Sequence, residues 1–170
     1  MKRLLLATWL LSGLCFTLSA QLLDVKLGTP ESQLLLMAQA KTREVGEAQF
    51  SLVQKLGTSY VFRQVIDGYQ VDLTFTVEAE EVTSIKTIHQ GLNDTHFVAM
   101  REYFEETVKD WHSKSYFVPN ARLANQAMKS FSGYQAQAAA FTDPSMSLMF
   151  VFVYYEKDGI AYFSRLERKF

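Results

Sequence analysis

The chain has little material for covalent or metal-dependent chemistry. Its 170 residues include one cysteine, three histidines and three prolines. The cysteine, Cys15, lies among the first twenty residues, so residues 21–170 contain no thiol. This absence excludes disulfides, thiol nucleophiles and thiolate metal sites from residues 21–170, and that part of the chain must be stabilised by core packing.

The histidines His89, His96 and His112 are seven and sixteen residues apart. Zinc sites on a helix pair two histidines four residues apart, typically as His-Glu-x-x-His, and the chain has no such pattern. Gly-x-Ser-x-Gly and glycine-rich phosphate-binding loops are also missing. The sequence therefore predicts no metal and no other cofactor.

A hydrolytic site whose residues are dispersed along the chain is the catalytic alternative. Ser84, His89 and Asp94 follow one another at intervals of five residues. Sequence order alone makes no triad, because the three side chains must converge in space. The adjacent acids Glu80-Glu81 and Glu105-Glu106 are typical of a solvated turn and a solvated helix surface. We therefore predict no catalytic residue and keep a small secreted hydrolase as an alternative.

The chain also lacks a clear excess of either positive or negative charge. The 17 basic and 18 acidic residues give a formal net charge of −1. No dense cluster of lysine and arginine is available to neutralise phosphates, so a nucleic acid partner is not expected. No run of about twenty apolar residues follows the first twenty residues, so no transmembrane span is expected either.

The chain begins with the features of an export signal. Lys2 and Arg3 precede an apolar run over residues 4–18, and small residues lead to Gln21. This three-part layout is typical of a secretory signal peptide. We predict a signal peptide over 1–20, a single domain over 21–170, and a periplasmic or secreted location. Leu14 occupies the place before Cys15 where a lipoprotein signal normally has a small residue, which predicts that Cys15 is not lipidated.

The apolar periodicity predicts an α+β chain with a mostly antiparallel sheet and helices packed on one face. The arrangement leaves open whether two similar halves share the sheet. Val71 to Val77 alternates strictly, which is typical of a strand with one buried and one wet face. The segment 146–155 is nearly all apolar, which predicts a central strand covered on both faces. Helices are expected over 30–42, from the Gly91–Asp94 break to about 111, and over 121–128. Strands are expected over 50–55, 60–66, 71–77, 82–89, 134–141, 146–155 and 160–166.

The second of these helices carries an apolar stripe that we expect to pack on the sheet. The stripe consists of Phe97, Met100, Phe104, Val108 and Trp111.

Aromatic residues are abundant, at 14% of the chain. Most are expected in the core, but Trp111 and Tyr116 lie beside His112 where burial is less obvious. Tyrosine and tryptophan favour recognition surfaces. We therefore predict Trp111, His112 and Tyr116 as a ligand-binding group, with anchoring of the loop to the core as the alternative.

Two segments carry a family resemblance. Residues 28–34, Gly-Thr-Pro-Glu-Ser-Gln-Leu, resemble the helix entry of the SmpA-type outer-membrane assembly lipoproteins, which share a fold with the beta-lactamase inhibitor proteins. The segment Tyr69 to Ile88, with Val-Thr-Ser-Ile at 82–85, is similar to their sheet hairpin. The resemblance implies helices on one face of an antiparallel sheet, a fold often used to grip another protein.

These observations lead to a non-enzymatic binding or envelope-accessory module whose partner is another envelope or secreted protein. A carrier that encloses an apolar ligand between helix and sheet is an alternative of another class. A large apolar cavity between the long helix and the sheet would favour the carrier. A filled core with an exposed polar and aromatic sheet face would favour the protein binder, and a convergent Ser/His/acid cluster would favour the hydrolase.

Overall fold

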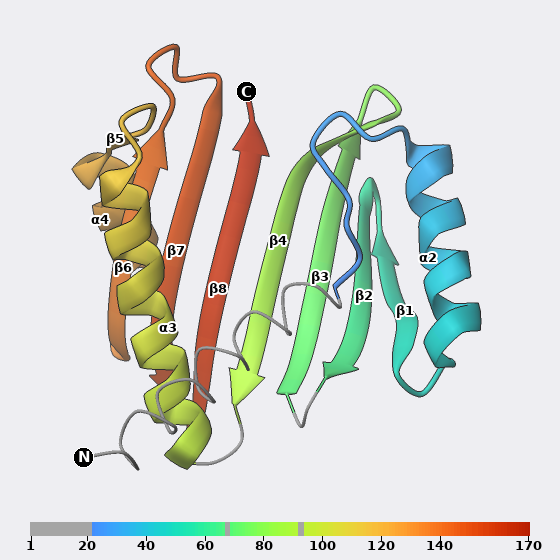
Figure 1. Cartoon of the computed structure of the whole chain (residues 1–170), viewed down its shortest axis with the longest axis horizontal. Coiled ribbons are helices and arrows are strands. Elements are labelled where there is room, and N and C mark those ends of the chain that lie inside the picture. The colour runs from blue at the N-terminus through green and yellow to red at the C-terminus, as the bar shows by residue number, and fades with distance from the viewer. Residues whose placement is uncertain (1–21, 67–68, 92–93) are drawn as a thin grey trace, which may run out of the picture.

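The computed structural model describes residues 22–66, 69–91 and 94–170 (Figure 1). The predicted signal peptide and residues 67–68 and 92–93 lie outside these ranges. The described helices are α2 (Glu31–Val45), α3 (Asp94–Ser113) and α4 (Ala121–Lys129). The strands are β1 (Phe50–Leu56), β2 (Ser59–Ile66), β3 (Tyr69–Glu78), β4 (Glu81–Gly91), β5 (Val118–Pro119), β6 (Gln135–Thr142), β7 (Leu148–Lys157) and β8 (Ile160–Lys169).

The strands form one open, antiparallel, eight-stranded sheet in the order β1-β2-β3-β4-β8-β7-β6-β5. Each half of the chain supplies four neighbouring strands, and the halves join where the last strand of one pairs with the last strand of the other. In that junction His89 of β4 is opposite Phe163 of β8. The α+β class and the antiparallel sheet predicted from the sequence are confirmed.

Two helices, α2 and α3, pack on one face of the sheet. Leu34 of α2 is fully buried in a cluster with Phe50 and Phe62. The predicted stripe of α3 packs as expected, with Phe104 and Trp111 buried against the apolar side chains of β7 and β8. Burial of such stripes is the main stabilising contribution in a domain without disulfides.

The third helix, α4, packs on the opposite face, so the expectation that helices share one face holds for α2 and α3 only. Leu123 of α4 contacts the cluster that contains Val151 and Val153 of β7. Successive side chains of a strand point to opposite faces, so an all-apolar strand needs cover on both. Strand β7 is such a strand, and α3 and α4 cover its two faces as the sequence predicted. Asn120 caps α4 by accepting a hydrogen bond from the backbone N–H of Leu123 at 3.1 Å.

Candidate ligand-binding groove

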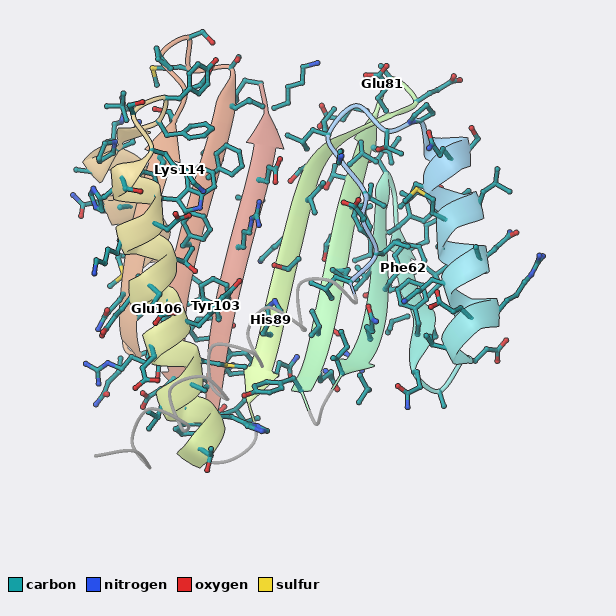
Figure 2. All side chains as sticks on the ribbon, in the orientation of Figure 1. Phe62, Glu81, His89, Tyr103, Glu106 and Lys114 are labelled. Carbon is teal, nitrogen blue, oxygen red and sulfur yellow. The ribbon has the colours of Figure 1, made fainter. Side chains whose placement is uncertain are left out.

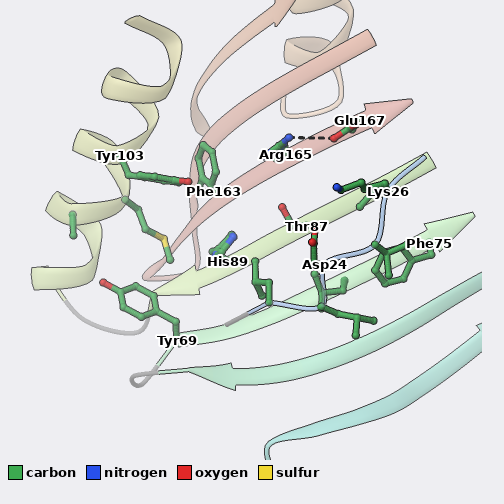
Figure 3. A pocket seen from close by; sticks show the side chains of 17 residues that line it. Asp24, Lys26, Tyr69, Phe75, Thr87, His89, Tyr103, Phe163, Arg165 and Glu167 are labelled. Carbon is green, nitrogen blue, oxygen red and sulfur yellow. Dashed lines mark hydrogen bonds and ion pairs between the residues drawn. The ribbon is translucent and has the colours of Figure 1, made fainter. Parts of the chain in front are cut away.

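A groove of about 540 Å³ lies on the face of the sheet that α2 and α3 share (Figure 3). One wall is the N-terminal half of α3, and the other is the segment 22–26 that precedes α2. The floor consists of side chains from β3, β4 and β8. Three parts of the chain that are distant in sequence therefore build the groove.

The segment 22–26 is held against the sheet by the hydrogen bonds that follow it. The backbone N–H of Gly28 donates to the carbonyl of Val82 at 2.8 Å, and that of Val82 donates to the carbonyl of Thr29 at 2.9 Å. Val25 is buried in the same cluster as Phe75. Backbone pairing and one buried side chain thus place this wall over β3 and β4.

The strand register arranges the floor in three successive rows. The first row pairs Val71, His89 and Phe163. The side chains of His89 and Phe163 line the groove. The second row consists of Leu73, Thr87 and Arg165, and the third consists of Phe75, Ile85 and Glu167. With about 3.3 Å per residue along a strand, the three rows span about 13 Å. The groove therefore runs along β4 and β8.

The end of the groove nearest α3 is aromatic. Tyr103 projects from α3 toward the sheet (Figure 2), and its ring meets the ring of Phe163 edge-on with centroids 4.9 Å apart. The His89 ring lies 5.9 Å from the same phenyl ring. Tyr69 also lines this end and stacks on His96 of α3 at 4.1 Å.

A glycine allows α3 to approach β4 at this end. A Cβ atom added at Gly91 would lie 2.6 Å from Cβ of His96 and 3.2 Å from Cε of Met100. Side chains of any other residue type would therefore force the helix away from the strand. Close approach of backbone is a common reason for a glycine inside a strand.

The other end of the groove carries four charged side chains whose charges cancel. Arg165 and Glu167 of β8 form an ion pair at 3.1 Å. Lys26 and Asp24, from the segment before α2, are exposed at the rim. This end therefore has no net charge.

His89 is a polar side chain at the aromatic end of the groove. It is half-buried, and neither ring nitrogen has a hydrogen-bond partner among the residues that the structure describes. Burial lowers the pKa of His89 to about 4, because desolvation disfavours the charged imidazolium. At neutral pH the imidazole is uncharged and offers one donor and one acceptor.

The residues predicted as a ligand-binding group lie at the opposite end of α3. Trp111 is 8% exposed and packs on Phe150 at 4.4 Å between ring centroids, so it anchors the core. His112 and Tyr116 are exposed. The structure brings these three residues to one region, which Lys114 marks in Figure 2, but none of them lines the groove. A binding role for them stays a prediction.

The groove residues were missed because they come from separate elements. One signal was present, since His89 continues the alternation of Ile85 and Thr87 on a strand whose neighbour Val71–Val77 is strictly alternating. A histidine at a core-facing position of such a strand is a candidate for a functional side chain.

The dispersed hydrolytic site is not assembled as its spacing suggested. Ser84 and His89 are an odd number of residues apart on the regular part of β4, so their side chains point to opposite faces of the sheet. The side chain of Asp94 lies outside the described part of the structure. Within the described ranges, no group of three or more His, Cys, Asp and Glu residues could hold a metal ion. No helix in those ranges is long and apolar enough to cross a membrane, as the sequence predicted.

Comparison of the chain with protein-family models, with curated proteins and with solved structures finds no match. The resemblance to the SmpA-type lipoproteins and the beta-lactamase inhibitor proteins therefore stays a prediction.

Proposed function

We propose that the protein is an exported binding protein that carries a small, largely apolar molecule in the groove between α3 and the segment 22–26, above the sheet. The observation that supports this proposal is the open volume of about 540 Å³ in that position. Small-molecule sites are typically concave spaces of about 300–1,000 Å³ with an apolar lining and a few converging polar groups. Of the three interpretations that the sequence left open, the carrier is the one that requires such a space.

The packing around the groove supports the same interpretation. Protein interiors are close-packed, with few voids larger than a water molecule. The C-terminal half of α3 follows this rule, because Trp111 contacts the rings of Phe150 and Phe152. At the N-terminal half of α3 the floor includes Leu73 and Phe75, yet the residues that the structure describes do not fill the space above them. A bound apolar molecule would gain about 25 cal/mol for each Å² of apolar surface removed from water.

The test uses an uncharged fluorescent probe, N-phenyl-1-naphthylamine, whose emission rises in apolar sites. Ala99 lines the groove, and its neighbour Val98 is 59% exposed. We expect the probe to bind the unmodified protein, Ala99→Phe to weaken binding at least about tenfold, and Val98→Phe to leave it unchanged. Absence of probe binding, or equal loss in the two variants, would contradict the proposal.

A protein partner is the second candidate, supported by the face of the sheet that bears α4. On that face α4 packs against β6 and β7, and no described helix covers β2 and β3 there (Figure 1). Arg63 and Asp72 form an ion pair at 2.8 Å in this open area, beside Thr74. Thr74→Arg would block a partner on this face without touching the groove. A variant that keeps probe binding but fails to restore the phenotype of a deletion strain would favour this second candidate.

A further inference from the structure

We infer that the ligand of the groove is an uncharged molecule with a flat apolar ring system and a hydroxyl or carbonyl group, and that His89 hydrogen-bonds that group. This inference rests on the proposed function, because it names the ligand class and the recognition residue of the same groove. It adds a specific role for a side chain that lines the groove.

The position of His89 carries the first step. Its ring lies in the first row of the floor, beside Phe163, and faces the groove (Figure 3). The described residues satisfy neither of its nitrogens. Neither nitrogen is sealed off from the groove, so each can take a hydrogen-bond partner from a molecule bound there. A ligand hydroxyl or carbonyl that reaches the floor would supply it.

The charges of the groove carry the second step, which is that the ligand is uncharged. The imidazole of His89 stays neutral because burial lowers its pKa to about 4. Arg165 is already paired with Glu167 at 3.1 Å, and the exposed rim residues Lys26 and Asp24 carry opposite charges. An ionic group at the aromatic end would lose its hydration without gaining an opposite charge.

The aromatic side chains of the groove support the third step, which is that the ligand has a flat ring system. Phe163 lies in the floor. Its ring is held by an edge-on contact with the ring of Tyr103, with 4.9 Å between the two centroids. Aromatic pairs prefer edge-to-face or offset-stacked arrangements, so a flat ligand can stack where the two walls leave the floor open. The three rows of the floor, about 13 Å long, give room for fused rings beyond the hydrogen bond at His89.

A matched set of three probes tests the ligand class. Naphthalene, 2-naphthol and 2-naphthoate share one ring system and differ in having no polar group, a hydroxyl and a charged carboxylate. Each is titrated at pH 7 against protein loaded with N-phenyl-1-naphthylamine, and displacement is measured by fluorescence. We expect 2-naphthol to bind about two- to tenfold more tightly than naphthalene, the range of one net hydrogen bond, and 2-naphthoate to bind most weakly.

Variants at His89 test the residue. His89→Phe should remove the preference for 2-naphthol over naphthalene while N-phenyl-1-naphthylamine still binds. His89→Gln keeps a neutral donor and acceptor and should retain part of the preference. Lys86→Phe, at an exposed position on the opposite face of β4, is the control and should change nothing.

The outcomes separate this inference from the proposed function. Equal affinity for 2-naphthol and naphthalene, tighter binding of 2-naphthoate, or an unchanged preference in His89→Phe would each overturn the inference. The proposed function survives these results if the probe still binds and Ala99→Phe still weakens it. If the probe binds nowhere, or binds in a way that Ala99→Phe does not affect, the proposed function fails and the inference fails with it.

Discussion

The ring of Tyr103 in α3 meets the ring of Phe163 in β8 edge-on, with 4.9 Å between centroids. This contact joins the long helix to the second half of the sheet at the aromatic end of the groove. The contact fixes the positions of Phe163 in the floor of the groove and of Tyr103 in one wall.

Tyr103→Ala should therefore weaken probe binding more than it weakens the fold. An aromatic pair contributes about 0.5–1.5 kcal/mol beyond its buried area, and Tyr103 is only partly buried. Tyr103→Phe keeps the ring and should retain probe binding. Urea melts and titration with N-phenyl-1-naphthylamine measure the two effects. Unchanged probe affinity in Tyr103→Ala would mean that this ring does not form the wall of the binding site.

The packing of α3 gives a second prediction. Phe104 is 5% exposed in the cluster with Trp111, so Phe104→Ala should lower the free energy of unfolding by about 3–5 kcal/mol. Arg101 pairs with Glu105 at 3.5 Å on the exposed side of the helix, so Arg101→Ala should cost less than about 1 kcal/mol. Equal losses in denaturant melts would show that the buried face of α3 is misassigned.

The sequence predicted the class, the helices and the strands well, because local patterns determine them. The strict alternation over Val71–Val77 and the stripe from Phe97 to Trp111 each report which side of an element is buried. The hairpin that joins β7 to β8 turns at Asp158 and Gly159, whose φ angles are 52° and 73°. Glycine and aspartate accept such left-handed conformations more readily than most residues do.

The placement of α4 could not be predicted from local pattern. Its expected range was nearly right, but the side of the sheet on which it packs depends on which neighbouring strands need cover. The small side chains Ala138 and Ala140 of β6 join Val151 and Val153 of β7 on the second face, and α4 covers them. That relationship exists only after β6 and β7 have paired.

The groove was hidden for a similar reason. His89, Tyr103 and Phe163 belong to three elements, and only the pairing of β4 with β8 and the docking of α3 bring them together. The predicted group at Trp111 was contiguous in sequence, but its tryptophan is a core side chain. Aromatic composition alone did not distinguish an anchor from a binding residue.

Export gives a prediction that depends on the sequence only. The small residues before Gln21 predict cleavage after Ala20, and Leu14 predicts that Cys15 carries no lipid. The purified native protein should then have the intact mass of residues 21–170. A mature chain that starts at Cys15 with added acyl mass would contradict the proposed secreted or periplasmic carrier.

Acid should destabilise the fold through His89. Burial lowers the pKa of His89 from its ordinary value of 6.5 to about 4, so the unfolded chain binds a proton at a higher pH than the folded protein does. Stability is therefore unaffected by His89 above about pH 6.5, falls as the pH drops from 6.5 to 4, and loses at most about 3 kcal/mol in total.

His89→Gln should remove this part of the acid sensitivity, because glutamine does not titrate. Other groups that face His89 or line the groove also respond to acid or carry charge, so the comparison must subtract their effect. These groups are Asp24, Lys26, Arg165 and Glu167. Urea melts of the unmodified protein and of His89→Gln at pH 7 and pH 4.5 give that difference directly. A variant that loses as much stability between the two pH values as the unmodified protein would show that His89 is not desolvated in the groove.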